Sequence, residues 1–177
     1  MKYYKTDNRA DYAEMFESIS EFADKKIPRG TSVALVGEKI RPAKQNEIPF
    51  GVISSFPIML GGNGGFEWSG KYLRDEFGNY IFHEVEKWYS KDKDGRAVRG
   101  YTAQSKAPKG SLIKMKREPM INPEYDKNKP YVTRMERIEW NMVGLVGKLK
   151  ILKGQPVDPR WIKLKDINDE VEEWLIR

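Results

Sequence analysis

Short apolar runs, interrupted by glycine or proline every few residues, are the feature that most limits what this chain can fold into. Ser32–Val36 is an apolar run of this kind and ends at Gly37. Three more follow at similar spacing: Lys39–Arg41, which stops at Pro42, then Pro49–Ser54 and Pro57–Leu60. Short runs of this composition with such punctuation are typical of β-strands. They favour a barrel or a sandwich.

The middle of the sequence predicts a β-hairpin with a long continuation. Residues Phe82–Tyr89 alternate with the two-residue period of a strand. The polar run Ser90–Arg96 follows, and its Asp94-Gly95 pair is a strong turn signal. Residues 104–132 are then rich in lysine and proline. We interpret them as a long irregular excursion, either a solvated loop or extended hairpin, or an arm that wraps a neighbouring subunit.

The C-terminal part contains the most apolar predicted strand and one predicted helix. Trp140–Ile151 is the strand, and Gly144 and Gly147 within it permit close approach of another backbone. The tail, residues 165–177, has four apolar residues at helical spacing: Ile167, Val171, Trp174 and Leu175. Its acidic residues come early and Arg177 last, as the helix dipole prefers. We therefore predict a mainly β fold, a barrel or sandwich with an extended hairpin arm, with a short C-terminal helix and minor α+β character.

The residue types that the chain lacks exclude several classes of site. There is no cysteine, which excludes disulfides, thiol catalysis and thiolate metal sites, and His83 is the single histidine. Lysine and arginine exceed aspartate and glutamate by 32 to 26, but the charges are interspersed, so nucleic-acid binding is not favoured. No apolar stretch approaches the ~20 residues of a membrane span, and the N-terminus lacks the apolar core of a signal peptide. We expect the chain to stay in the compartment where it is made.

Residues 10–17 carry the candidate catalytic chemistry. Asp11 and Glu14 are three residues apart beside aromatic side chains, where an apolar surround would raise a carboxyl pKa. Peptide hydrolysis without serine, cysteine or metal needs a carboxylate to activate water and an acid to protonate the leaving amine. The same spacing is also typical of a helix start with a capping carboxylate. The apolar pattern of residues 11–23 fits either a helix face or a bent strand, so both interpretations stay open.

Five segments, in this order and spacing, resemble one family: Asp11–Glu17, Gly37–Ala43, Gly51–Ser55, Gly70–Gly78 and Trp140–Gly147. They look like the intramolecular chaperone autoprocessing domain of phage tail appendages, the glutamic peptidase G2 family. The resemblance implies a leader or shaft remnant at residues 1–10 and a single chaperone and autoprocessing domain at residues 11–177.

The resemblance also implies a function. The domain would form a homotrimer, help the upstream shaft of a tail spike or fibre to fold in the host cytoplasm, and belong to the virion tail. It would act as an endopeptidase once, on its own chain, between Ala10 and Asp11. By position Glu14 is the base for the water and Asp11 polarises or protonates the scissile amide. If Glu14 comes from a neighbouring subunit, cleavage would report correct assembly, which is a further hypothesis. No cofactor or metal is required; nucleotide binding is implied for some members, without a located site.

Other functions stay open from the sequence. The main alternative is a free-standing, non-enzymatic virion structural or assembly protein that keeps the fold without proteolysis. A dyad of Ser54 or Ser55 with Lys71 is a rival catalytic device. Three cations, Lys71, Arg74 and Arg99, could hold an anion such as a nucleotide phosphate. Five tryptophans would suit a glycan-binding tail tip if they were exposed, and a core or subunit interface if not: Trp68, Trp88, Trp140, Trp161 and Trp174.

Overall fold

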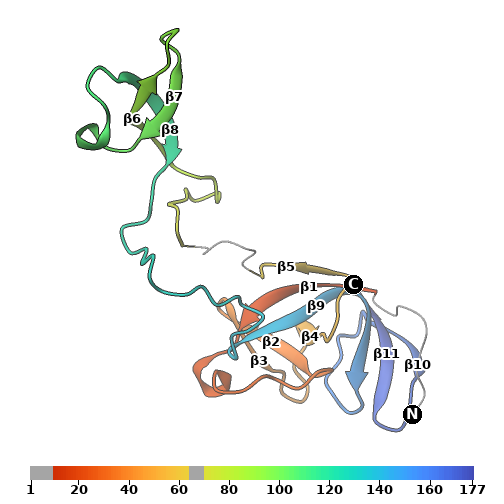
Figure 1. Cartoon of the computed structure of the whole chain (residues 1–177). Coiled ribbons are helices and arrows are strands. Elements are labelled where there is room, and N and C mark those ends of the chain that lie inside the picture. The colour runs from red at the N-terminus through yellow and green to blue at the C-terminus, as the bar shows by residue number, and fades with distance from the viewer. Residues whose placement is uncertain (1–9, 64–69) are drawn as a thin grey trace. The chain divides into compact units, whose positions relative to one another are not determined.

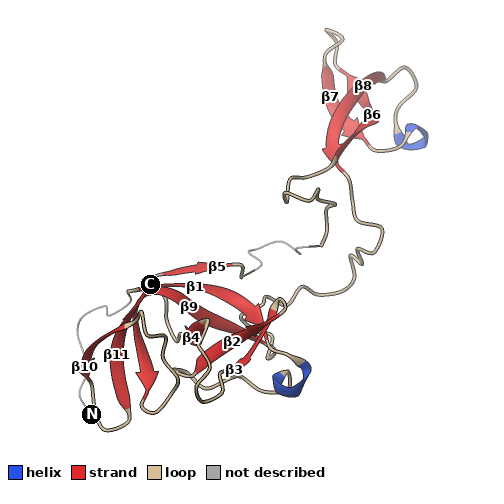
Figure 2. Ribbon diagram, turned by 180° about the vertical axis from the view of Figure 1, so that it is seen from behind, coloured by secondary structure: helices blue, strands red, loops and turns tan. Residues whose placement is uncertain are grey.

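The computed structural model describes residues 10–63 and 70–177. Nearly all regular structure in this part of the chain is β-strand, and the helical elements are two three-residue 3-10 turns, Ser20–Phe22 and Gln104–Lys106 (Figure 2). The prediction of a mainly β fold is confirmed. Within these ranges no helix has the length and apolar character to cross a membrane. The chain divides into two compact units, Met1–Phe66 with Tyr131–Arg177, and Glu67–Pro130.

The first unit is built on an eight-stranded sheet (Figure 1). Its strands are β1 (Asp11–Glu17), β2 (Ser32–Val36), β3 (Lys39–Pro42), β4 (Gly51–Ile53), β5 (Met59–Gly61), β9 (Trp140–Leu152), β10 (Ile162–Asp166) and β11 (Val171–Ile176). Six of them follow the order β10-β11-β9-β4-β2-β3. β1 pairs antiparallel with β9 and parallel with β5. Among the described residues β10 and β3, the ends of this path, do not pair, so the sheet is open and the predicted barrel does not form.

β9 organises the core of this unit because its side chains enter two apolar clusters. One cluster contains Ile27, Val33, Ile40, Ile53 and Val143. The other contains Val52, Leu149, Ile151, Trp161 and Ile176. β9 therefore joins the β2–β4 part of the sheet to β11. It also pairs with β1 from Asp11 opposite Gly147 to Glu17 opposite Trp140, with a shift of one residue between Tyr12 and Ala13. Burial of the two clusters holds β9 in place, since a slip of the whole strand by one residue would turn each of its side chains to the other face.

The second unit contains a three-stranded antiparallel sheet, ordered β7-β6-β8. Its strands are β6 (Phe82–Lys91), β7 (Ala97–Tyr101) and β8 (Leu112–Pro119). The predicted hairpin between β6 and β7 is confirmed: the Asp92 carboxylate accepts hydrogen bonds from the N–H groups of Asp94 at 3.0 Å and Arg96 at 2.7 Å. The stretch 104–132 is not irregular throughout, because β8 lies within it and pairs with β6.

The predicted C-terminal helix is wrong, because Val171–Ile176 forms strand β11 between β9 and β10. The preceding turn is set by Asn168, whose side-chain oxygen accepts hydrogen bonds from the N–H groups of Glu170 at 2.9 Å and Val171 at 2.8 Å. An isolated helix this short is marginal in water. The sheet instead supplies hydrogen bonds on both edges of the segment and buries Ile176, which is 1% exposed.

Candidate functional site

The two predicted catalytic carboxylates lie on β1, which alternates between buried and half-buried residues. Asp11, Ala13 and Met15 are buried on one face. Tyr12 and Glu14 share the other face, where the Tyr12 hydroxyl donates a hydrogen bond to Glu14. Residues an odd number apart on a strand point to opposite faces. The segment 11–17 is thus a strand, not the helix start that its spacing also allowed, and the structure does not bring Asp11 and Glu14 together within one chain.

Asp11 occupies a buried and incompletely satisfied environment. The residue is 6% exposed, and its Oδ2 has no hydrogen-bond partner. Burial raises the pKa of the Asp11 carboxyl, and a hydrogen bond with the Ser54 side chain partly opposes the rise. Its backbone is held in place, since the Asp11 carbonyl accepts a hydrogen bond from the N–H of Ile58 at 3.0 Å. This carboxyl therefore keeps a proton to higher pH than an exposed aspartate, which suits a general acid.

A cavity of about 500 Å³ opens beside Asp11. Besides Asp11, its charged and hydroxyl-bearing lining residues are Arg29, Ser54, Ser55, Lys148, Lys150 and Glu173. The lining thus includes three cationic residues and two acidic ones, and the space is large enough for water or for a side chain from another molecule. Glu173 is half-buried and forms an ion pair with Lys165 at 3.4 Å. It is a second carboxylate of this cavity that the sequence did not single out.

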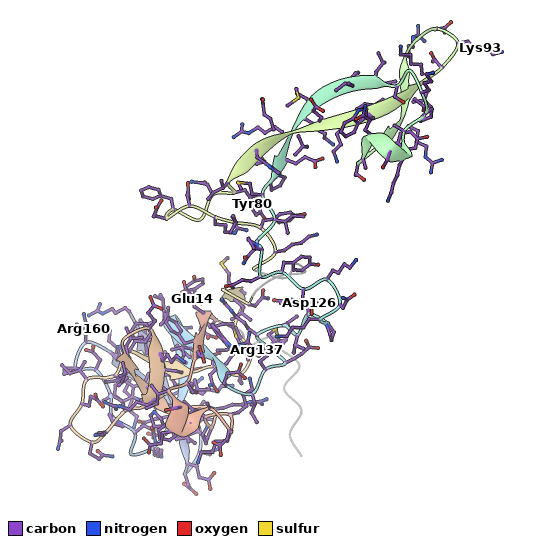
Figure 3. All side chains as sticks on the ribbon, turned by 90° about the vertical axis from the view of Figure 1, so that its left-hand side faces the viewer. Glu14, Tyr80, Lys93, Asp126, Arg137 and Arg160 are labelled. Carbon is purple, nitrogen blue, oxygen red and sulfur yellow. The ribbon has the colours of Figure 1, made fainter. Side chains whose placement is uncertain are left out.

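Glu14 lies beside strand β5, on the opposite face of β1 from this cavity (Figure 3 labels Glu14). Glu14 pairs in register with Gly61, where an added Cβ would lie 2.9 Å from the Tyr12 hydroxyl and 3.1 Å from Cγ of Glu14. The absence of a side chain at Gly61 leaves room for both. The hydrogen bond to Glu14 raises the pKa of Tyr12, so the hydroxyl remains a donor that can orient this carboxylate.

The peptide bond before Asp11 packs against the glycine-containing part of β9. The Ala10 carbonyl oxygen accepts a hydrogen bond from the N–H of Lys148 at 3.2 Å. A Cβ at Gly147 would lie 2.2 Å from that oxygen, and one at Gly144 would lie 3.1 Å from Oδ2 of Asp11. The predicted close approach of another backbone is confirmed at Gly147, where the approaching group is the predicted scissile bond; at Gly144 the nearest atoms are side-chain atoms of Leu149 and Asp11.

The rival serine–lysine dyad is divided between the two compact units. Ser54 follows β4 in the first unit, where it hydrogen-bonds Asp11, whereas Lys71 belongs to the second unit. The three cations proposed for an anion each lie over an aromatic ring: Lys71 is 4.9 Å from the centroid of Tyr72, Arg74 is 4.1 Å from Tyr80 and Arg99 is 5.5 Å from Tyr101. These contacts give each of them a packing role.

The described tryptophans have the environment of packed residues. Trp161 is buried, and Trp88, Trp140 and Trp174 are half-buried with inaccessible indole nitrogens. Trp68 lies outside the described residues. A glycan-binding surface made from this set is therefore not supported by the four that are described.

Sequence reasoning missed four contributors to the site: Tyr12 as the donor to Glu14, Ser54 as the partner of Asp11, the backbone of Lys148, and Glu173 in the cavity lining. Two of them had a signal in the sequence. Tyr12 and Glu14 are two residues apart, which places them on one face once the segment is taken as a strand. The Gly147-Lys148 pair was marked by its glycine. Nothing local linked Ser54 to Asp11, because their contact depends on the pairing of both β1 and β4 with β9.

Comparison with known proteins gives a consistent set of relatives. Residues 3–173 match the family model described as Peptidase_G2, IMC autoproteolytic cleavage domain. The pre-neck appendage proteins of Bacillus phages B103 and phi29 are each 35% identical over 142 residues, which are 80% of this chain and 14% of theirs. The putative phage-related protein YobO of Bacillus subtilis strain 168 is 36% identical over 139 residues. The chain thus spans 14% of the length of these relatives.

Two solved structures share the fold. The pre-mature gene product 12 of bacteriophage phi29 has a TM-score of 0.65 at 26% identity, over 99% of this chain and 23% of that one. The C-terminal fragment of the same gene product has a TM-score of 0.62 at 28% identity, over 94% of this chain and 100% of the fragment.

Proposed function

This chain belongs to the peptidase G2 family of autoproteolytic intramolecular chaperone domains, and we propose that it serves a phage tail appendage by driving assembly and then cutting its own chain before Asp11. In this proposal the domain forms a homotrimer in the host cytoplasm and aligns an upstream shaft of a spike or fibre. It becomes part of the virion tail, as the pre-neck location named for its relatives suggests.

The observation that best supports the proposed cleavage is the position of Asp11. A carboxyl group that is 6% exposed, with a raised pKa, directly follows a peptide bond whose carbonyl is held against Gly147. Burying an unpaired carboxyl oxygen costs stability, so its retention next to one particular bond needs a reason. Proton donation to the nitrogen of that bond supplies the reason.

The proposed reaction is a hydrolysis that balances with two carboxyl groups. A water oxygen adds to the Ala10 carbonyl carbon while ionised Glu14 takes one proton from the water. The Asp11 carboxyl gives its proton to the Asp11 backbone nitrogen, the carbon–nitrogen bond breaks, and the carbonyl re-forms. The products are a carboxyl group at Ala10 and an amine at Asp11. No cofactor enters this scheme, and nucleotide binding stays a separate proposal without a site.

The geometry favours cleavage between subunits. Glu14 leaves the face of β1 opposite to Asp11, so the Glu14 of one chain is directed away from its own bond. Strand β5, which pairs with β1 up to Glu14, has exposed apolar residues: Ile58, just before β5, is 66% exposed and Met59, in β5, is 63% exposed. Exposed apolar residues gathered in this way mark an interaction surface. A neighbouring subunit placed there would receive Glu14.

The second unit supports assembly independently. A three-stranded sheet is about the smallest that is stable by itself, and only with a packed apolar face. Here Ile113 and Met115 of β8 remain exposed, opposite Trp88 and Glu86 of β6. Covering this face by other copies of the same unit would bury it. The lysine- and proline-rich segment would then contribute to the subunit-wrapping arm that its composition suggested.

One observation favours the second candidate function, a non-enzymatic virion structural protein. Within one chain the two carboxylates cannot act on the same bond, because they lie on opposite faces of β1. If the assembled subunits do not bring Glu14 to a neighbouring Ala10–Asp11 bond, the fold would persist without proteolysis. The two functions share the oligomer and differ only in whether the bond is cut.

Intact-mass spectrometry of the purified chain separates them. The cleaving protein starts near 20.6 kDa and loses its first ten residues with time, and Glu14→Gln stops the loss. A mass that stays at 20.6 kDa would contradict cleavage and support the non-enzymatic structural function. Light scattering on the Glu14→Gln protein tests the assembly claim, since a trimer gives three times the mass of one chain and a monomer would contradict both functions.

A further inference from the structure

We propose that the backbone N–H of Lys148 is an oxyanion-stabilising donor for the scissile carbonyl, and that Gly147 is the residue that lets this carbonyl reach it. This assignment rests on the proposed cleavage before Asp11 and adds the electrophilic group that two carboxylates do not supply. Water attack on an amide places negative charge on the carbonyl oxygen. Fixed donors aimed at that oxygen are a large source of rate enhancement in acyl transfer.

The donor is already in contact with the atom that would carry the charge. The Lys148 N–H lies 3.2 Å from the Ala10 oxygen, and Ala10 directly precedes β1. The contact is on the long side of N–H to oxygen hydrogen bonds, so it has room to shorten as charge develops. The negative charge formed on attack would therefore be met by a dipole that is in place before the reaction.

Gly147 makes this contact sterically feasible. Its φ of +113° is one that side chains rarely allow, and an added Cβ would lie 2.2 Å from the Ala10 oxygen and 2.9 Å from the Asp11 Cα. Any other residue would push the scissile carbonyl away from the Lys148 amide. The glycine thus makes room for the scissile carbonyl, in addition to allowing the positive φ within β9.

The donor is held rigidly because β9 is paired on both sides at this point. Lys148 is in register with Leu175 of β11, and the neighbouring Gly147 is in register with both Asp11 and Ile176. A donor fixed by two neighbouring strands needs no reorganisation at the moment of reaction. Lys148 is also one of the residues that line the cavity beside Asp11.

In the reaction the carbonyl π electrons move to the Ala10 oxygen as the water oxygen bonds to carbon, and the Lys148 N–H stabilises the resulting negative charge without giving up its proton. The electrons return to re-form the carbonyl as the Asp11 nitrogen leaves with a proton from the Asp11 carboxyl. The other water proton resides on Glu14. Lys148 is unchanged at the end, as a catalytic group must be.

A matched pair of glycine substitutions tests the steric part. Gly147→Ala adds a methyl group against the scissile carbonyl, whereas Gly154→Ala has a similar positive φ of +80° with open space around the new Cβ. Both carry the backbone strain, so their difference isolates the contact. We expect Gly147→Ala to cleave about 10²- to 10³-fold more slowly than Gly154→Ala, the loss typical of one oxyanion donor. Equal rates in the two variants would overturn the assignment.

Replacing the Lys148 amide by an ester tests the donor itself and is independent of whether Gly147→Ala folds. The ester removes one N–H and keeps the lysine side chain. In a Glu14→Gln chain, which does not cleave, the infrared stretch of a ¹³C-labelled Ala10 carbonyl should move to higher frequency when the amide is replaced. In the otherwise unsubstituted chain the ester should slow cleavage about 10²-fold.

The outcomes of the ester experiment separate the contact from its catalytic role. An unchanged infrared frequency would overturn the contact between the Lys148 N–H and the Ala10 carbonyl. A shifted frequency with an unchanged cleavage rate would overturn the catalytic role of that contact. If the unsubstituted chain never cleaves, the frequency shift still reports the contact, while the catalytic assignment fails together with the proposed function.

Discussion

Asp11 and Glu14 are three residues apart on one strand, and their side chains leave it on opposite faces. Asp11 is buried beside a cavity, while Glu14 is half-buried and accepts a hydrogen bond from Tyr12. Two carboxyl groups of the same short segment therefore experience different environments. Such a division suits an acid and a base that act in one reaction, but only when a second copy of the chain supplies one of them.

The first prediction concerns which carboxylate activates the water. Glu173 lines the same cavity as Asp11 and is the alternative base within one chain. If Glu14 is the base, Glu14→Gln reduces the cleavage rate by at least about 10²-fold. Glu173→Gln should leave the cleavage rate unchanged, because this substitution removes only the ion pair with Lys165. The fraction of cut chain over time, measured by intact mass, checks this. Loss of cleavage in Glu173→Gln with retention in Glu14→Gln would assign the base to the cavity instead.

The second prediction is that Tyr12→Phe slows cleavage without changing assembly. The substitution removes the hydroxyl that hydrogen-bonds Glu14 and leaves the ring in place. Loss of one hydrogen bond to a charged group is worth about 1.5–3 kcal/mol, and we expect a rate decrease of about tenfold or more where that bond orients the carboxylate. Tyr89→Phe, in the second unit, is the control. A rate equal to that of the control would show that Tyr12 does not orient Glu14.

The third prediction is a decrease in cleavage rate as the pH rises. Because burial raises the pKa of Asp11, the protonated donor persists above the ordinary aspartate range, and raising the pH through that pKa removes it. The single-turnover rate constant should fall with pH on the alkaline side. Asp11→Asn should lower the rate by about 10²-fold or more and abolish this limb. An alkaline limb that survives in Asp11→Asn would belong to another group.

The fourth prediction concerns stability at low pH. Arg160 pairs with the buried carboxylate of Asp158 at 2.6 Å and lowers its pKa to about 2. Because the pKa of Asp158 is lower in the folded protein than the 3.8 of the unfolded chain, its ion pair stabilises the fold at pH values above 3.8. That stabilisation is lost as the pH falls toward about 2. Asp158→Asn should therefore lower the melting temperature at neutral pH, and its difference from the unsubstituted chain should shrink between those two pH values. Asp169→Asn, at an exposed turn, is the control. A difference that did not change with pH would mean that the ion pair is not its source.

The fifth prediction tests the core that positions β9. Ile151 is fully buried among Val52, Leu149, Trp161 and Ile176. Ile151→Ala should lower the free energy of unfolding by about 2–5 kcal/mol, whereas Leu164→Ala, 42% exposed on β10, should cost less than about 1 kcal/mol. Urea unfolding of both variants measures the difference. Similar costs would show that this cluster is not the core of the first unit.

The sequence predicted the strands well wherever a local signal set them. The runs at 32–36 and 140–151, with their glycine and proline boundaries, and the Asp94-Gly95 turn all describe short-range structure, and the fold confirms them. The tail was predicted wrongly because its apolar spacing suits a helix or a strand. Its state is decided by pairing with β9, a contact that no local pattern contains.

At the candidate site, too, the sequence could not predict an arrangement that depends on strand pairing. A separation of three residues puts Asp11 and Glu14 on one face of a helix but on opposite faces of a strand. The sequence left open whether this segment is a helix or a strand. It therefore identified Asp11 and Glu14 but did not show whether their side chains share a face. The strand assignment follows from the register of β1 on β9 and β5, which is a property of the whole sheet.

The central claim, that one chain's Glu14 cuts the neighbour's bond, is tested most directly by complementation. A Glu14→Gln chain has an intact Asp11 but supplies no base. An Asp11→Asn chain supplies Glu14, but its own scissile bond lacks the acid. Neither should cleave alone. The two are co-assembled from the unfolded state with one of them ¹⁵N-labelled, and each is followed by its intact mass. We predict that the Glu14→Gln chain loses its first ten residues in the mixture while the Asp11→Asn chain stays whole. A mixture in which both chains stay intact, although the unsubstituted protein cleaves, would contradict cleavage between subunits.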